Sequence, residues 1–164
     1  MEASLRAPFI IRWPGKVPAG SVNNEIVHIV DMYTTLAHLC GAEVPKDRAI
    51  DGVDQLDFFL GKQKSSNREG FPAYVADRLT AVKWRDWKMH LIKQDNMYDV
   101  PERLPLPKII NLLTDLKEEH DVAALNTWVA IPMVKIIGEF QTSLQKYPPI
   151  KSGTPDPYTP PVTR

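Results

Sequence analysis

The sequence predicts an α/β fold in two parts: one strand and helix of a mostly parallel α/β layer, then a four-stranded antiparallel sheet with one packed helix. A nearly all-apolar run at residues 9–13, closed by Pro14 and Gly15, is typical of a strand buried on both faces of a parallel sheet. Residues 79–92 are rich in aromatic and β-branched side chains, and Thr80, Val82 and Trp84 alternate with Ala81, Lys83 and Arg85, as residues on the two faces of an antiparallel strand do. Apolar side chains between residues 133 and 144 recur at helical spacing.

The first part covers residues 1–61. Because only a few residues precede the run at 9–13, we expect its neighbouring strands to lie outside this sequence. An extended run at 26–30 then leads to Asp31. We expect Asp31 to cap a helix, its carboxylate accepting hydrogen bonds from backbone N–H groups of the following turn.

The helix after Asp31 is expected to bury one apolar face that includes Leu36 and Cys40, and to end at Gly41. A second short helix is predicted within residues 53–60. The polar stretch at 62–70 is predicted to be an exposed linker.

The second part is predicted to begin at residue 73. Strands are expected at 73–77 and across 79–92, with a tight reversal at Arg85 and Asp86. We expect Trp84 and Trp87 to lie on the sheet face that packs under the helix. Residues 99–107 contain three prolines and are predicted to be a loop before a last strand at 109–113.

After the last strand, residues 114–120 are predicted to form a turn, and Glu118, Glu119 and Asp121 a solvated acidic cluster. Pro132 suits the first position of a helix, where its missing N–H costs nothing. The predicted organisation is an α/β part at 1–61, a linker at 62–72, a sheet-plus-helix subdomain at 73–147 and a Pro-rich tail at 148–164.

Composition excludes few classes of protein. The 164 residues are 43% hydrophobic, which is enough for a core, and the 20 acidic and 20 basic residues balance. This balance gives no electrostatic reason to expect nucleic acid or an anionic membrane as a partner. No apolar run has membrane-spanning length. The single cysteine, Cys40, excludes an internal disulfide, and the cellular compartment is left open.

Many motif positions together resemble the later part of the sulfatases, the arylsulfatase family of the alkaline phosphatase superfamily. A Pro-started apolar strand ends in Trp13-Pro14-Gly15, a histidine precedes an Asp-started helix, and an Ile-Asp-Gly-Val segment follows. The matching positions are Glu2, Arg6, Pro8, Trp13, Pro14, Gly15, His28, Asp31, Thr35, Gly41, Ala42, Pro45, Asp51, Gly52, Val53, Asn111, Leu112, Asp115 and Glu118.

The resemblance implies an alkaline phosphatase-like sulfatase fold and hydrolysis of a small-molecule sulfate ester in the intact enzyme. It also implies a formylglycine, made from the first residue of Cys-x-Pro-Ser-Arg or Ser-x-Pro-Ser-Arg, and calcium or another divalent cation. Neither motif occurs in this sequence, where Cys40 is followed by Gly41. We therefore assign no catalytic residue, no metal ligand and no cofactor to this chain, and expect an N-terminal catalytic part as its partner.

Four histidines, at positions 28, 38, 90 and 120, lack the close spacing of metal ligands. His28 could reach a site from the end of a strand, although backbone hydrogen bonding explains it more simply. Trp128 stands in a loop ahead of Pro132. His28 and Trp128 are the two candidates for a pocket rim.

The favoured hypothesis is the C-terminal part of an arylsulfatase-like hydrolase, inactive by itself. One alternative is a free-standing, non-catalytic module that serves binding or assembly. Another is part of a phosphate or phosphonate ester hydrolase of the same superfamily, which shares the fold.

Overall fold

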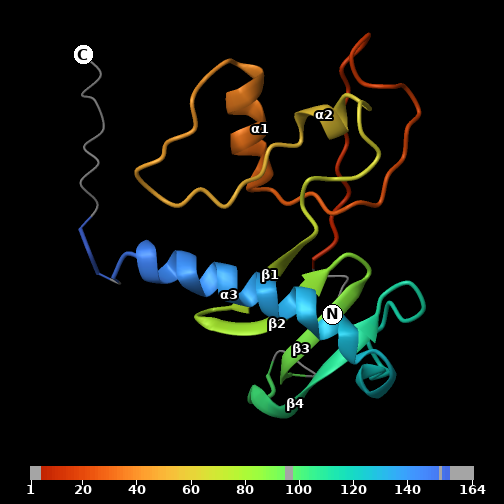
Figure 1. Ribbon diagram of the computed structural model, residues 1–164, viewed down its shortest axis with the longest axis vertical. Coiled ribbons are helices and arrows are strands. Elements are labelled where there is room, and N and C mark those ends of the chain that lie inside the picture. Colours follow the sequence, from red (N-terminus) through yellow and green to blue (C-terminus); the bar gives the residue numbers. More distant parts are fainter. Residues whose placement is uncertain (1–4, 95–97, 152, 156–164) are drawn as a thin grey trace.

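The computed structural model describes residues 5–94, 98–151 and 153–155, and Figure 1 shows two halves. One half holds the N-terminal segment with helices α1 and α2, and the other holds the sheet with helix α3 along it. The elements are α1 (Asp31–Leu39), α2 (Leu56–Phe59), β1 (Gly70–Val75), β2 (Arg78–Trp84), β3 (Trp87–Lys93), β4 (Glu102–Asn111), the 3-10 turns η2 (Ala123–Leu125) and η3 (Thr127–Val129), and α3 (Ala130–Lys146).

The four strands form one antiparallel sheet in the order β1-β2-β3-β4, as the sequence predicts. The reversal between β2 and β3 is as tight as expected, since Trp84 pairs directly with Trp87. Arg85 has a φ of 50°, the left-handed conformation that the favoured two-residue hairpin turns require.

The hydrophobic core lies between this sheet and α3. Val82 and Met89 from the sheet meet Met133 from α3, and each is at most 2% exposed. Trp84 and Trp87 pack against this cluster from the same face, which confirms the predicted face of the sheet. Other core members are Ile109 and Val129, with Leu79, Leu91, Ala123, Ala130, Ile136 and Ile137 partly buried around them.

Strand β4 begins within the segment that we expected to be a loop. Its register with β3 shifts between His90 and Ile92, so that His90 pairs with Lys108 while Ile92 pairs with Arg103. Residues 104–107, with two of the prolines, fill this irregularity. β4 is also an edge strand, where a proline's missing N–H removes no ladder bond.

The apolar run at residues 9–13 belongs to no strand, so the predicted strand is not formed in the described part of the chain. Ile10 is 88% exposed, and Phe9 packs only partly, with its ring 5.7 Å from the ring of Phe59. A strand requires a neighbour to satisfy its backbone, and the described residues provide none beside this run.

Helix α1 ends as predicted, but its apolar side chains are not buried. Gly41 adopts a φ of 69°, and the Ala42 N–H reaches back to the Ala37 carbonyl at 2.8 Å, as in a Schellman cap. Leu36 is 55% exposed and Cys40 is exposed, contrary to the expectation that they lie on a buried face.

Helix α3 begins two residues before the predicted start, so Pro132 is its third residue and not its first. The proline still lies in the first turn, where a backbone N–H has no intrahelical partner. The helix ends at Lys146, before the two prolines, as expected. Glu2 and most of the predicted Pro-rich tail, residues 156–164, lie outside the described residues.

Candidate functional site

The centre of the N-terminal half is the carboxylate of Asp31, which is fully buried. It accepts hydrogen bonds from the backbone N–H of His28 and from that of Val53, each at 2.9 Å. The prediction that Asp31 caps the helix is therefore wrong, because its carboxylate does not accept from the first turn of α1. The carboxylate binds backbone before the helix and in a distant segment, and α1 has no side-chain cap.

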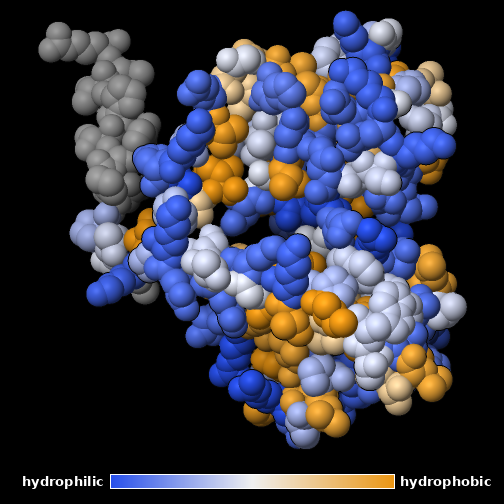
Figure 2. All heavy atoms as spheres, viewed as in Figure 1, coloured by the Kyte–Doolittle hydropathy of each residue, from blue (hydrophilic) through white to orange (hydrophobic). Residues whose placement is uncertain are grey.

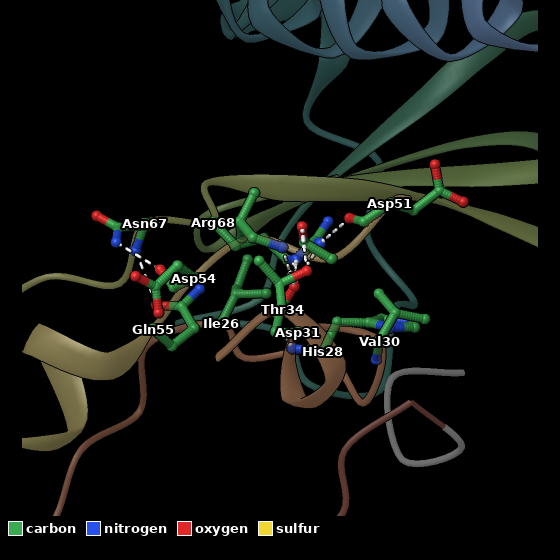
Figure 3. A network of polar contacts seen from close by, with 12 residues as sticks. Ile26, His28, Val30, Asp31, Thr34, Asp51, Asp54, Gln55, Asn67 and Arg68 are labelled. Atoms are coloured by element: carbon green, nitrogen blue, oxygen red, sulfur yellow. Dashed lines mark hydrogen bonds and ion pairs between the residues drawn. The ribbon is translucent and has the colours of Figure 1, made fainter. Parts of the chain in front are cut away.

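Arg68 neutralises this carboxylate. Its Nε lies 3.0 Å from both carboxylate oxygens, and its Nη2 lies 2.6 Å from Oδ1 (Figure 3). The same Nη2 donates to the Asp51 carbonyl at 2.6 Å. Burial alone would raise the pKa of Asp31, but the hydrogen bonds from Arg68, Val53 and His28 outweigh it and hold the pKa below its usual value.

The contacts of the Ile-Asp-Gly-Val motif explain why it contains glycine at position 52. Gly52 passes so close to the start of α1 that a Cβ there would collide with the Val30 carbonyl oxygen. The Gly52 carbonyl accepts the Thr34 hydroxyl at 3.0 Å, and the next N–H, that of Val53, reaches Asp31. The motif residues His28, Asp31 and 51–53 thus lie together, held by Arg68.

Gln55 extends the network toward the sheet. It is fully buried, its N–H donates to Thr35 Oγ1 at 3.0 Å, and its Oε1 accepts from Asn67 N–H at 3.0 Å and Ser66 Oγ at 3.2 Å. Its Nε2 finds no acceptor among the described residues. The segment predicted to be an exposed linker therefore contains the partners of both Gln55 and Asp31, and its Arg68 side chain is only 12% exposed.

We call this set the Asp31–Arg68 clasp: His28, Asp31, Asp51, Gly52, Val53, Gln55, Ser66, Asn67 and Arg68. It ties α1 and the 51–55 segment to the residues that lead into β1. The resemblance singled out its motif residues, but not Arg68 or Gln55. A lone arginine in a polar stretch carries no spacing signal that would identify it.

The two candidates for a pocket rim do not meet at one site. The His28 ring stands edge-on against Phe71, 5.3 Å between centroids. The Trp128 ring lies 5.9 Å from Trp87 and 6.2 Å from Trp84, both edge-on, so it covers the end of the core.

A cleft of about 1140 Å³ lies between the two halves of the chain. The N-terminal segment and α2 form one wall, and the β2–β3 turn and the residues that follow β4 form the other. In Figure 2, mostly hydrophilic residues lie along the boundary between the two halves. The lining of the cleft mixes apolar side chains such as Phe9, Phe71 and Leu112 with charged ones such as Arg6 and Lys83. His28 and Trp128 are not among the residues that line it.

A second buried charge cluster lies on the sheet. Glu118 has a 5% exposed side chain, contrary to the predicted solvated turn, and accepts from Lys88 Nζ at 3.0 Å. The Glu118 Oε2 also lies 2.5 Å from His90 Nε2. Burial opposes the charged form, but the hydrogen bonds from His90 and Lys88 outweigh it and lower the pKa of Glu118 to about 2.

The described residues do not fit a calcium site. One group could bring three ligand atoms together, Asp115, Glu119 and His120. Glu119 and His120 are exposed, and the Asp115 carboxylate already accepts the His120 N–H at 2.7 Å. Calcium needs six to eight oxygen ligands, which this turn does not provide.

The comparisons with known proteins agree with the motif pattern. The family model described as "N-sulphoglucosamine sulphohydrolase, C-terminal" matches residues 1–124. N-acetylgalactosamine-6-sulfatase of Canis lupus familiaris is 33% identical over 123 residues, and human arylsulfatase D is 36% identical over 95 residues. The chain belongs to the sulfatase family, as a C-terminal sulfatase region.

Solved structures support the same family through the fold. The crystal structure of the sulfatase PsFucS1 from Pseudoalteromonas sp. superimposes with a TM-score of 0.74 at 27% identity, over 85% of this chain. A solved structure from Bacteroides thetaiotaomicron, described in connection with the metabolism of multiple glycosaminoglycans, superimposes with a TM-score of 0.64 at 26% identity, over 82% of this chain.

These relatives are much longer than the part that matches. The chain spans 23% of the dog enzyme, 16% of human arylsulfatase D and 30% of the PsFucS1 chain. Among the described residues, no helix combines the length and the apolar character needed to cross a bilayer.

Proposed function

We propose that this chain is the C-terminal part of a sulfuric ester hydrolase and works only together with an N-terminal catalytic part. The observation that carries the proposal is the sulfatase match over residues 1–124 in a chain that lacks both forms of the formylglycine motif. In the intact protein, a formylglycine with a bound calcium or similar cation would supply the hydrolytic chemistry.

In this proposal the chain has a structural task. Residues 1–61 complete the α/β catalytic domain, 62–72 connect it and include the first residues of β1, and 73–147 form the rest of the sheet-plus-helix subdomain. The Asp31–Arg68 clasp supports this task, since its ion pair and buried hydrogen bonds fix the first part to the start of β1. The place of His28 and Trp128 at a pocket rim remains a prediction.

The coding DNA around this sequence tests the proposal. We expect an upstream in-frame segment with Cys-x-Pro-Ser-Arg or Ser-x-Pro-Ser-Arg. The polypeptide translated from the whole reading frame should hydrolyse an aryl sulfate in the presence of calcium, and replacing the first motif residue by alanine should abolish turnover.

The same assay separates the alternatives. Turnover of an aryl phosphate or phosphonate in place of the sulfate would favour the phosphate or phosphonate ester hydrolase. A reading frame with no hydrolase segment, together with a cooperatively folding 164-residue protein, would favour the non-catalytic module and overturn the proposal.

A further inference from the structure

The chain carries a row of exposed apolar side chains around the start of α3. The members of this row are Leu125, Trp128, Ile131 and Val134, which are 87%, 54%, 74% and 58% exposed. We call these four residues the α3 row. Between them, Val129 and Met133 are fully buried in the core, so the same segment is apolar on its inner and on its outer side. A surface helix needs only an inner apolar side to pack on its sheet.

The α3 row lies on one side of the segment because its members are three residues apart. Leu125 and Trp128 belong to the 3-10 turns η2 and η3, and in such turns side chains three residues apart lie above one another. Ile131 and Val134 continue the row on α3, where residues three apart are neighbours on the helix surface. In Figure 2, apolar residues reach the surface of the sheet half where the first turns of α3 lie in Figure 1. An exposed apolar patch of this kind marks an interaction surface.

The segment around the α3 row also contains no charged residue. Residues 122–134 include no Asp, Glu, Lys or Arg, although these four types make up 24% of the whole chain. The centres of protein–protein interfaces are poor in charged residues and rich in tryptophan. The composition of this segment is therefore that of an interface centre.

The α3 row is separate from the features described above. Its residues do not line the cleft between the two halves. They also lie beyond residue 124, where the match to the family model ends. The row is therefore a feature of this chain in addition to those that the family model covers.

We propose that the α3 row is a two-fold contact through which two copies of this chain form a dimer. A two-fold contact places the same patch on both copies, so that the patch must be complementary to itself. An uncharged apolar row meets this requirement, because each copy removes the other's apolar side chains from water. Dimer formation of this kind is independent of the proposed hydrolase activity.

The charges next to the α3 row also suit a second copy. Lys135 Nζ lies 3.7 Å from Glu139 Oε1, one turn further along α3, and both side chains are exposed. Because each copy brings a cation and an anion that are already paired, two copies meet without charge repulsion. A membrane surface would favour a helix with many Lys and Arg residues, whereas α3 contains two lysines and no arginine.

Sedimentation velocity at increasing concentration tests the contact. It is applied to the polypeptide of the whole reading frame and to the 164-residue protein, and we expect both to dimerise with a dissociation constant of about 10 µM or lower. Ile131→Asp should raise this constant at least ten-fold, because each dimer would then bury two unpaired carboxylates. Ile150→Asp is the matched control at a side chain that is 86% exposed and lies beyond α3, and it should change the constant less than two-fold.

The Ile131→Asp variant should remain folded. Residue 131 lies in the first turn of α3, where backbone N–H groups without intrahelical partners favour a nearby carboxylate. Its circular dichroism spectrum and thermal unfolding, measured where the parent is monomeric, should match those of the parent. Val134→Lys places the opposite charge in the α3 row and should weaken the dimer in the same way, so that the result does not depend on one variant.

The opposite results would overturn the inference. Monomers of both polypeptides at about 100 µM would exclude the contact, and dimers that neither Ile131→Asp nor Val134→Lys weakens would place it elsewhere. Dimers of the 164-residue protein alone would assign the α3 row to the N-terminal polypeptide. Dimers that form only after residues 148–164 are removed would assign it to that segment. A parent that floats with phosphatidylcholine vesicles, when Ile131→Asp does not, would assign it to lipid.

Discussion

Asp31 shows at the scale of a single residue why a buried charge must be paired. A carboxylate removed from water loses its hydration, and the protein has to replace that hydration with donors. Arg68 and two backbone N–H groups do so here, at distances of 2.6–3.0 Å. The ion pair fixes the position of α1 relative to the segment before β1, since both Asp31 and Arg68 make several hydrogen bonds.

Removing Arg68 should leave the Asp31 charge buried without its cation. We expect Arg68→Ala to lower the free energy of unfolding of the 164-residue protein by about 3–5 kcal/mol. Arg48→Ala is the control, since Arg48 pairs with Asp47 at a distance of 2.8 Å but both side chains are 67% exposed. That change should stay within about 0.5 kcal/mol. Urea denaturation followed by circular dichroism measures both, and equal effects would refute the role given to the clasp.

Glu118 should make stability depend on acid pH. Its pKa falls from 4.5 to about 2 on folding, so the folded state resists protonation that the unfolded state accepts. The stabilisation is complete above about pH 4.5 and is lost as the pH falls toward 2, by about 3 kcal/mol in total. Carboxyl NMR titration of Glu118 measures its pKa directly.

Glu118→Gln is the matching variant. It should be less stable at neutral pH, because Lys88 then loses its buried counter-charge. Its stability should also fall less between pH 4.5 and 2 than that of the parent, the remaining decline including the contribution of Asp31, whose pKa is lowered too. A Glu118 that titrates near 4.5 would contradict this account.

Sequence reasoning found some of these charged and hydrogen-bonding residues and missed others. The resemblance selected His28, Asp31 and Glu118 as motif positions. A motif does not say which residues those side chains contact. Arg68 and Lys88 were not found, since a buried ion pair joins residues 37 and 30 positions apart that no local pattern connects. The predicted solvated turn at Glu118 failed for the same reason.

At the scale of elements, the predictions of the antiparallel sheet and of α3 were confirmed, whereas those of a strand at 9–13, of a loop at the start of β4 and of a buried apolar face on α1 were wrong. Alternation and turn chemistry predicted β2, β3 and their hairpin, and helical spacing predicted α3. The start of β4 was missed because prolines disfavour the interior of a strand, although an edge position and an irregular register admit them. The run at 9–13 has strand composition but no neighbour among the described residues.

Substitutions at two glycines test how closely the 51–53 segment approaches α1. A Cβ at Gly52 would meet the backbone of Val30 and, at 2.8 Å, the Thr34 hydroxyl, whereas a Cβ at Gly138 in α3 meets nothing within 4 Å. We expect Gly52→Ala to destabilise the protein by about 1–3 kcal/mol. Gly138→Ala should stabilise it by about 0.5–1 kcal/mol, because alanine loses less entropy in a helix. Thermal unfolding distinguishes the two signs, and a stabilising Gly52→Ala would show that the 51–53 segment does not hold α1 closely.

At the scale of the whole molecule, one half of the chain has an apolar core and the other half is held together by polar contacts. The sheet and α3 enclose a core whose central side chains are almost fully buried. The N-terminal half is held by polar contacts in the Asp31–Arg68 clasp and exposes its apolar side chains. This asymmetry supports the proposal that the chain works together with an N-terminal catalytic part.

The most direct test of this account is the activity of the 164-residue protein alone. Purified protein is incubated with an aryl sulfate and calcium, alongside its Cys40→Ala variant. We predict no turnover by either protein above the uncatalysed rate, because the chain lacks the formylglycine motif. Sulfate release by the isolated chain that survives Cys40→Ala would contradict the account.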